Sequence, residues 1–481
     1  MRLILPMLGL MLCCSSLCLA QKAFDKQQKE VLQALDSKTE IYGDLAHQIW
    51  NLAELGYQEE KSITLLQAQL KEAGFNLEQG VAEIPTAFVA SYGSGEPVIG
   101  LLAEYDALPG FSQEALPTKQ AKEGLSTGHA CGHHLFGSGS VAAAIEVKNW
   151  LERTGTSGTV RLYGTPAEEG GAGKVYMVRA GLFDDVDAVI HWHPGSGNSA
   201  SAASSLANKS AKFRFYGQAS HAAVAPERGR SALDGVEALN YMVNMMREHV
   251  PMESRIHYVI TRGGEAPNVV PAYAEVFYYV RHPKMRMVRS IFDRVVKAAE
   301  GAALGTGTQL EYEVIHGVYN LLPNRTLAEK MHHNLERVGG VEYTAEERAF
   351  AEEIISSYPD SEVTPEMASE VGEFRVIEFG AGGSTDVGDV SWAVPTVGLR
   401  TATWVPGTPP HSWQAVAAGG MSIGTKGMMV AAKTMALTAM DLFKDPSICA
   451  EALEELKKRR GPAYKYEALL GDRTPPLDYR K

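Results

Sequence analysis

Apolar residues recur at helical spacing near the start of the chain, and short apolar runs follow them. Residues 26–75 alternate charged and apolar positions in a way that predicts one or two amphipathic helices. Segment 87–93 is strand-like, and segment 98–110 is an apolar run that ends in acidic residues and a Pro-Gly pair. The second pattern is typical of a buried strand that leads into a loop.

The alternation of strands and helices continues to about residue 207. Residues 134–152 form a predicted helix of small and apolar residues, 159–174 read as a strand, a turn and a helix start, and 186–195 as a short strand that ends near its two histidines. This order predicts an α/β domain with a mostly parallel sheet. Sites in such sheets form at the carboxyl ends of the strands. Several residues able to bind a metal or move a proton follow the predicted strands: Asp106, Glu168, Glu169, His191 and His193.

The pattern changes at about residue 208. Between 208 and 324 the predicted elements follow the order βαββαβ, which indicates a ferredoxin-like α+β domain inserted into the larger one. The α/β pattern returns in 325–450, so the first and second parts of the large domain are 21–207 and 325–450. Residues 451–481 are charged and contain prolines, and we expect a poorly ordered tail or a surface strap there.

The N-terminus has the features of a secretory signal peptide. Arg2 precedes an apolar run that ends in small residues, and we expect cleavage after Ala20. A membrane anchor is the alternative, but the run is at the lower limit for spanning and no basic cluster follows it. Lipidation at Cys13, Cys14 or Cys18 is a weaker alternative. Cleavage predicts a periplasmic or secreted protein. It would leave only Cys131 and Cys449, and two cysteines so far apart in the sequence do not indicate a fold held together by disulfides.

Charge and hydropathy exclude some partners. The formal net charge of -12 argues against a general affinity for nucleic acid, which needs clustered Lys and Arg. No segment after the signal peptide has the pattern of a transmembrane helix, so we expect no membrane association once the signal is removed.

The stretch GHACGHH (128–134) is the first candidate for chemistry. Cys131 and His133 offer a thiolate and an imidazole, both good zinc ligands, at a predicted loop-to-helix junction. A lone pair of this kind is more often structural, and spacing alone does not choose between His133, His129 and His134. A nucleophilic cysteine is the rival interpretation, but a histidine two residues away is rarely placed to act as its base.

Other candidates come from later strand ends. Glu168 and Glu169 are adjacent, so one carboxylate can bind a metal while the other faces a water molecule. Taken alone, they are better explained as acidic residues that complement a helix N-terminus. One ligand from His191 and His193 is sufficient, and His411 lies in a Gly/Pro loop where a histidine is usually only solvated. These residues indicate a site only when they are taken together, because a parallel sheet would bring them to one edge.

Motifs along almost the whole chain resemble the M20 metallopeptidase/amidohydrolase family, in its cysteine-containing aminoacylase/carboxypeptidase branch. They occur in the family's order: EYDALPG, GHACGHH, PAEEGG, WHPG, SHAAVAPERGRSALD, PNVVPA, STDVGDVSW and HSW. The resemblance implies a dimetal catalytic domain with an inserted lid and dimerisation domain, and a homodimer formed through that lid. It implies two divalent ions, Zn or Mn, per chain.

The resemblance also assigns roles to single residues. It implies a two-metal site with the ligands Cys131, His133, Glu169, His193 and His411. Glu168 would be the general base and acid, and Asp106 would orient a ligand histidine. His221 would stabilise the oxyanion across the dimer, while Asn268 and Arg281 would bind the substrate's backbone and carboxylate. Without the resemblance, Arg281 would be read as a surface charge at a strand end.

Three positions depart from the family pattern. His134 stands where most of the branch has Asp, His191 is an extra histidine, and Thr385 replaces a Glu before Asp386. We expect these departures to affect specificity, above all at His134. The resemblance implies hydrolysis of N-acyl or N-aroyl amino acids, including aminobenzoyl-glutamate. The alternatives are a dipeptidase or small-peptide carboxypeptidase, and a non-catalytic binding protein on the same scaffold.

Overall fold

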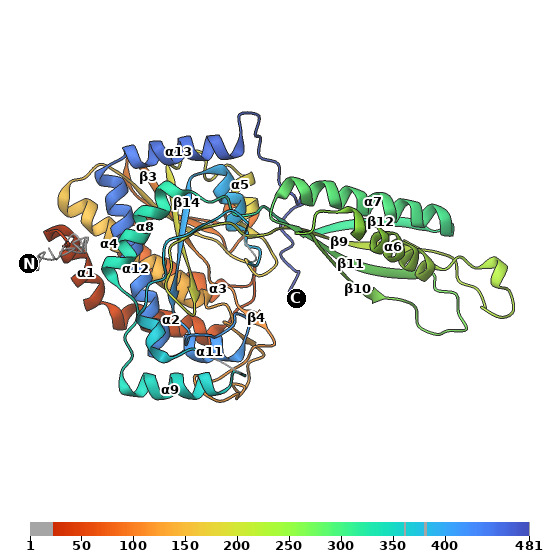
Figure 1. The fold of residues 1–481 in the computed structure, drawn as a ribbon, viewed down its shortest axis with the longest axis horizontal. Helices are drawn as coiled ribbons and strands as arrows, with labels where there is room; N and C mark the ends of the chain where they lie inside the picture. The colour runs from red at the N-terminus through yellow and green to blue at the C-terminus, as the bar shows by residue number, and fades with distance from the viewer. Residues whose placement is uncertain (1–22, 360–361, 380–381, 481) are drawn as a thin grey trace, which may run out of the picture.

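A mixed sheet forms the centre of the larger body of the molecule (Figure 1). The computed structural model describes residues 23–359, 362–379 and 382–480, and the predicted signal peptide, residues 1–20, lies outside them. The strands of the sheet are, in spatial order, β1 (Asn76–Gln79), β2 (Phe88–Ser94), β6 (Gly158–Gly164), β3 (Val98–Ala103), β7 (Ala188–Gly195) and β14 (Thr396–Ala402). β6, β3, β7 and β14 are parallel, and β1 and β2 add an antiparallel edge. The predicted mostly parallel sheet is confirmed.

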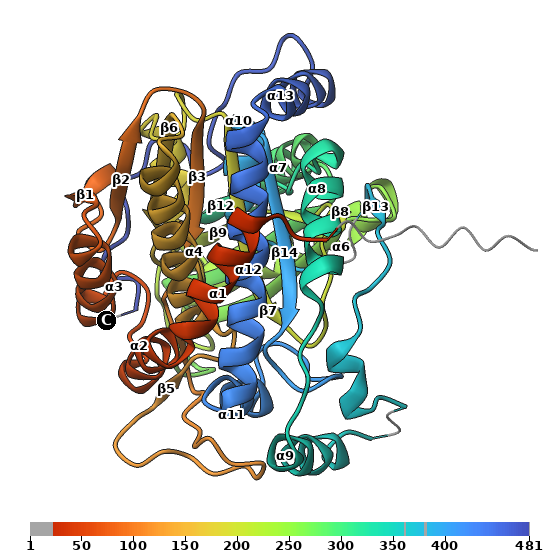
Figure 2. The same cartoon turned by 90° about the vertical axis from the view of Figure 1, so that its left-hand side faces the viewer.

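Burial on both faces explains the apolar strands. Every residue of β3 is buried, and its sequence VIGLLA has no polar position. Two long helices, α4 (His133–Thr154) and α12 (Ser422–Lys444), pack on each other and against this sheet (Figure 2). Small residues in α4 allow this packing, since a Cβ on Gly139 would lie 2.9 Å from Met428 Cγ.

The remaining helices surround this core. The amphipathic N-terminal segment forms α1 (Lys26–Ser37), α2 (Thr39–Leu52) and α3 (Glu60–Glu72). After the inserted unit come α8 (Arg325–Val338), α9 (Ala345–Ser356), α10 (Val387–Ala393), α11 (Trp413–Gly419) and α13 (Ser447–Arg460). The short α5 (Gly173–Arg179) packs against α10. Within the described residues, no helix combines the length and apolar character needed to cross a membrane.

A second unit projects from the larger body (Figure 1). Its elements follow the order β9 (Ala207–Tyr216), α6 (Ala232–Met246), β10 (Arg255–Arg262), β11 (Tyr273–His282), α7 (Met285–Thr306) and β12 (Gln309–Val318). The strands form a separate antiparallel sheet in the order β10-β11-β9-β12. The two helices bury their apolar sides with those of the sheet in a core of their own.

The structure bears on two local expectations. The strand predicted over 186–195 is β7, which ends at Gly195 and pairs with β14 as far as Ala402. The segment after residue 450 is not a poorly ordered tail at its start, because α13 continues to Arg460 and packs on α8. The residues that follow α13 contribute buried side chains at Leu469 and Leu470.

Candidate metal centre

Side chains from five separate segments meet at the carboxyl ends of the parallel strands. Glu104 and Asp106 follow β3, Glu168 and Glu169 follow β6, and His193 lies in β7. Cys131 and His133 come from the turn into α4, and His411 from the loop after β14. This is the edge of the sheet where the sequence predicted a site.

A tight turn places Cys131 and His133. Gly132, between them, has φ 78°, which is the left-handed region that favours glycine, and it precedes the first residue of α4. The turn lies directly on β7, since a Cβ on Gly132 would be 2.7 Å from Pro194 Cβ. The backbone at Gly132 therefore brings the cysteine and the histidine next to His193.

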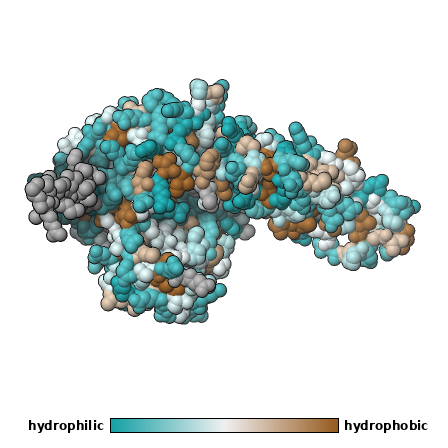
Figure 3. Space-filling view, viewed as in Figure 1, coloured by the Kyte–Doolittle hydropathy of each residue, from teal (hydrophilic) through white to brown (hydrophobic). Residues whose placement is uncertain are grey.

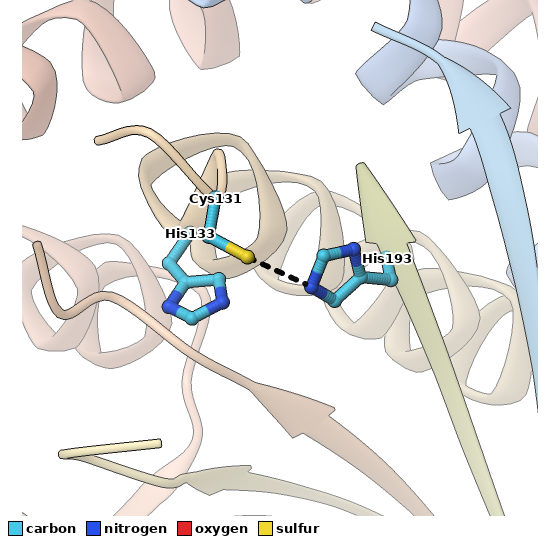
Figure 4. Close-up of side chains that lie close together, drawn as sticks. All are labelled: Cys131, His133 and His193. Atoms are coloured by element: carbon cyan, nitrogen blue, oxygen red, sulfur yellow. Dashed lines mark hydrogen bonds between the residues drawn. The ribbon is translucent and has the colours of Figure 1, made fainter. Parts of the chain in front are cut away.

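The potential ligand atoms form three overlapping groups. Cys131 lies with His133 and His193 in the first and with Glu169 and His411 in the second, and all ligand atoms within a group are within 4.8 Å of one another. The Cys131 Sγ to His193 Nε2 distance is 3.4 Å (Figure 4). The His411 Nε2 to Glu169 Oε1 distance is 3.1 Å. The structure thus brings together all five residues predicted as ligands, with Cys131 common to two groups.

The third group contains a residue that the sequence analysis missed. Glu104 Oε2 lies 3.1 Å from His133 Nε2, and Glu168 completes the group. Glu104 precedes Asp106 by two residues, the spacing that places side chains on one face of an extended segment. This spacing is the feature of the sequence that could have identified Glu104 as part of the site.

Three buried polar atoms in these groups have no hydrogen-bond partner within the described part of the chain. They are Glu104 Oε2, His133 Nε2 and Glu169 Oε1. Buried polar atoms are normally satisfied, so these atoms call for an explanation, since their ionisable neighbours at 3.1 Å do not form hydrogen bonds with them. Two ligands of one ion, each about 2.0–2.3 Å from it, lie roughly 3–3.7 Å apart in tetrahedral geometry. The His411–Glu169 separation of 3.1 Å and the Cys131–His193 separation of 3.4 Å fit ligands of this kind.

Asp106 organises two of the segments. Its Oδ1 is 2.8 Å from His133 Nδ1, and its Oδ2 accepts the backbone N–H of Glu169 at 2.9 Å. His193 Nδ1 is 2.7 Å from the Pro194 carbonyl oxygen. A ring that donates from Nδ1 leaves Nε2 free as a ligand, and in both histidines Nε2 points into the groups described above.

Electrostatics differ sharply between neighbouring carboxyl groups. Burial, together with the charges of Glu104 and Glu169, raises the pKa of Glu168 well above its ordinary value. Burial opposes ionisation of Asp106, but His133, the backbone N–H of Glu169 and Lys174 together outweigh it and lower the pKa of that carboxyl. A pair of carboxyls with pKa values moved in opposite directions is typical of sites that both bind charge and transfer protons.

A buried lysine lies behind the third group. Lys174 Nζ is 2.7 Å from Glu104 Oε1 and 2.7 Å from Asp386 Oδ1, and its side chain is 0% exposed. Asp386 also accepts the Lys174 backbone N–H at 2.9 Å. Sequence reasoning missed Lys174, because nothing in the GGAGK stretch distinguishes a buried cation from a surface lysine.

The other two histidines of the motif, His129 and His134, are in the protein interior. His134 Nε2 is 3.0 Å from the Gly419 carbonyl oxygen, and His129 Nε2 is 3.2 Å from that of Ile49. The two rings contact each other, with centroids 4.8 Å apart. Our expectation that His134 marks altered specificity is not supported by this position, which places it in the packing between α4 and α11. His191 packs beneath β14, since a Cβ on Gly398 would lie 2.2 Å from His191 Nε2.

The predicted residues of the inserted unit are spread along it. His221 and Asn268 are exposed in neighbouring loops, joined by a hydrogen bond from the Ala222 N–H to the Asn268 carbonyl at 3.0 Å. Arg281 lies near the far end of β11, which has ten residues and spans about 30 Å. The structure therefore separates Asn268 from Arg281 within one chain.

Comparison with known proteins identifies the family. The sequence pattern of peptidase family M20/M25/M40 matches residues 100–413. The chain is 43% identical over 449 residues to one of the p-aminobenzoyl-glutamate hydrolase subunits of Escherichia coli K12, covering 88% of this chain and 93% of that protein. This chain belongs to peptidase family M20/M25/M40. It is accordingly a hydrolase, as the sequence predicted.

Two further comparisons agree with this family. The chain is 29% identical over 446 residues to Xaa-Arg dipeptidase of Mus musculus, covering 89% and 92% of the two chains. The fold is shared with an aminobenzoyl-glutamate utilization protein from Klebsiella pneumoniae, with a TM-score of 0.59, 18% identity and coverage of 86% and 98%. It is also shared with a dinuclear metal-binding M20 peptidase from Bacillus subtilis, with a TM-score of 0.57 and 18% identity.

Proposed function

We propose that this M20-family member is a dimetal amidohydrolase that releases a free amino acid from an N-acyl or N-aroyl amino acid. The observation that carries the proposal is the pair of ligand groups that share Cys131, next to the carboxyl of Glu168. The similarity to a p-aminobenzoyl-glutamate hydrolase over most of both chains supports an aroyl-glutamate as substrate. The similarity to a dipeptidase supports dipeptides as the second class.

The donor set fits two divalent ions. Cys131, His133 and His193 would hold one ion, and Cys131, Glu169 and His411 the other. Thiolate and imidazole suit zinc, and carboxylate and imidazole also suit manganese. Such ions, when bound, polarise the scissile carbonyl and make a coordinated water more acidic.

The residues of the chain supply proton transfer and orientation. Glu168 accepts the proton of the attacking water and then donates it to the leaving amine, a task that suits a carboxyl whose pKa is raised by burial. Asp106 holds the His133 ring and the Glu169 backbone in place throughout. Glu104 forms a buried ion pair with Lys174 and contacts His133 from the side of the protein interior.

A second copy of the chain would complete the site. Because about 30 Å of β11 separates Asn268 from Arg281, both contact one small substrate only if they come from different copies of the chain. We propose that the inserted unit is a ferredoxin-like lid and dimerisation domain, with His221 and Asn268 acting on the partner's substrate and Arg281 binding the carboxylate. Tyr258, Val259 and Ile260 of the sheet-edge strand β10 are exposed, and apolar patches appear over this unit in Figure 3.

The predicted signal peptide supports the further proposal that the enzyme acts in the periplasm or outside the cell.

Replacement of the general base tests the mechanism. Glu168→Gln keeps the size of the side chain and removes its ability to accept a proton, so turnover should fall at least about a thousandfold. Elemental analysis should still find about two ions per chain. Amino-acid release from aminobenzoyl-glutamate and from a dipeptide panel would distinguish the two substrate classes. Substantial turnover by Glu168→Gln would contradict the assigned role.

A further inference from the structure

The residues after α13 run back to the catalytic body as a C-terminal strap, defined here as residues 462–480. In Figure 1 this segment passes from α13 along the junction between the two units and ends beside it. Leu469 and Leu470 in the strap are 2% and 4% exposed. The strap lies tightly on β12, because a Cβ on Gly317 would be 2.8 Å from Leu469 Cβ. It is therefore a packed part of the structure.

The strap is first attached to the inserted unit. Tyr319 Oη donates to the Glu467 carbonyl oxygen at 2.7 Å, and Arg289 of α7 bonds the same carbonyl and pairs with the Glu467 carboxylate. Arg473 then donates to the Ile315 carbonyl oxygen of β12 at 3.0 Å. These bonds fix residues 467–473 on the base of that unit.

A second attachment joins the strap to the catalytic body. Arg179, at the end of α5, donates to the carbonyl oxygens of Gly471 and Arg473, both at 2.8 Å. α5 follows the PAEEGG loop directly in the sequence. The two bonds from Arg179 therefore hold the strap close to that loop.

The end of the strap reaches a predicted metal ligand. Arg480 Nη2 donates to the Glu169 carbonyl oxygen at 2.7 Å, and Tyr479 Oη donates to the same oxygen at 3.3 Å. The Arg480 guanidinium lies 5.0 Å from the centre of the Tyr479 ring, and that ring meets Tyr57 edge-on at 5.5 Å. A Cβ on Gly56 would be 2.3 Å from Tyr479 Oη, so this glycine makes room for the hydroxyl.

The Glu169 peptide groups need this support because the loop has no regular structure of its own. Ala167 adopts φ 58°, a left-handed conformation that is unfavourable for alanine. On the N-terminal side, the Glu169 N–H is held by Asp106 at 2.9 Å. Arg480 and Tyr479 hold the carbonyl on the other side, one of them through a charge-assisted bond. The residue is fixed at both ends, and its side chain is directed at His411.

We propose that Tyr479 and Arg480 are positioning residues that hold Glu169 in the orientation that binds metal. This proposal rests on the proposed metal site, since Glu169 matters to it only as a ligand. Removing a partner outside the ligand shell typically weakens metal binding by about 10- to 100-fold. Because the contacts are to a backbone oxygen and not to the carboxylate, we expect the lower end, about tenfold.

The test titrates Co²⁺ alone into the chelator-treated, full-length protein, in competition with a chelator and with the visible spectrum recorded. Wild type should bind two Co²⁺ per chain. Arg480→Ala should bind one of them about tenfold more weakly and with an altered spectrum, and Arg480→Lys should recover part of that loss. Arg459→Ala is the matched control, because Arg459 of α13 pairs with Glu378 and Glu455, away from the site. It should bind Co²⁺ like wild type.

Different outcomes reject different statements. If wild type binds two Co²⁺ and Arg480→Ala binds both with unchanged affinity, the positioning role is wrong. An equal loss in Arg459→Ala would also reject it, because the effect would then be one of general stability. If wild type itself binds no Co²⁺, the metal site fails and the positioning role fails with it. Tyr479→Phe, which keeps the ring and loses only the hydroxyl, should lower affinity about two- to threefold, and it replaces Arg480→Ala if that variant does not fold.

Discussion

Replacing Lys174 with methionine tests the buried charges behind the metal groups. The change keeps a side chain of similar length and removes the cation between Glu104 and Asp386. All three side chains are at most 1% exposed, and each carboxylate oxygen lies 2.7 Å from Lys174 Nζ. Removing one partner of a buried ion pair costs about 3–5 kcal/mol, because an uncompensated charge remains. Since two carboxylates lose their partner here, we expect the upper part of that range at pH 8.

The loss should depend on pH. Burial raises the pKa of Glu104, and Lys174 opposes that rise, so in the variant this pKa moves further upward. A carboxyl with a folded-state pKa above its unfolded value gives stability that is present at low pH and is lost as pH rises through the folded pKa. The penalty of Lys174→Met should therefore be smaller at pH 5 than at pH 8.

Urea unfolding of the chelator-treated protein at pH 5 and pH 8 measures this effect. The control is Lys457→Met, because Lys457 pairs with Glu454 at 2.8 Å with both side chains more than half exposed. Such surface pairs contribute about 0–1 kcal/mol. A loss below about 1 kcal/mol for Lys174→Met at pH 8, or a loss equal to that of the control, would refute the reasoning.

Two further substitutions test the turn at the site and a buried acid beside it. Gly132→Ala should weaken Zn²⁺ binding at least tenfold, because the added Cβ would lie 2.7 Å from Pro194 Cβ. Gly155 is the control, since it also has a positive φ, 66°, but no atom lies within 4 Å of an added Cβ. Gly155→Ala should therefore bind Zn²⁺ like wild type. Equal affinities in a competitive zinc titration would contradict this. Burial and the charge of Asp106 raise the pKa of Glu59 to about 8, so its stabilisation is present below pH 4.5 and is lost as pH rises toward 8. Glu59→Gln should then raise the free energy of unfolding, measured by thermal unfolding, by at least about 1.4 kcal/mol at pH 9 and by much less at pH 5. An effect that does not depend on pH would contradict this.

The strand ends were predictable from the sequence because apolar runs and the polar residues after them have a direct structural meaning. Asp106, Glu168 and Glu169 follow buried strands, and the parallel sheet brings such positions to one edge. The selection of His133 over its two neighbours was not available from spacing. It depends on Gly132, whose left-handed turn points Cys131 and His133 at β7 and sends His134 into the core.

Features set by long-range packing could not be predicted. Lys174 has the same local pattern as an exposed lysine, and only the meeting of β3, α5 and α10 buries it. A surface strap was one of the two alternatives expected after residue 450, and the choice between them depends on bonds to α7, β12 and Glu169.

The most direct test of the account is the hydrolysis of aminobenzoyl-glutamate by the chelator-treated protein before and after metal is restored. We predict no glutamate release from the metal-free protein and recovery of release as Zn²⁺ or Mn²⁺ is added, reaching a plateau at about two ions per chain. Release that is undiminished after chelation, or none with either metal on this substrate and on the dipeptide panel, would contradict the proposed dimetal amidohydrolase.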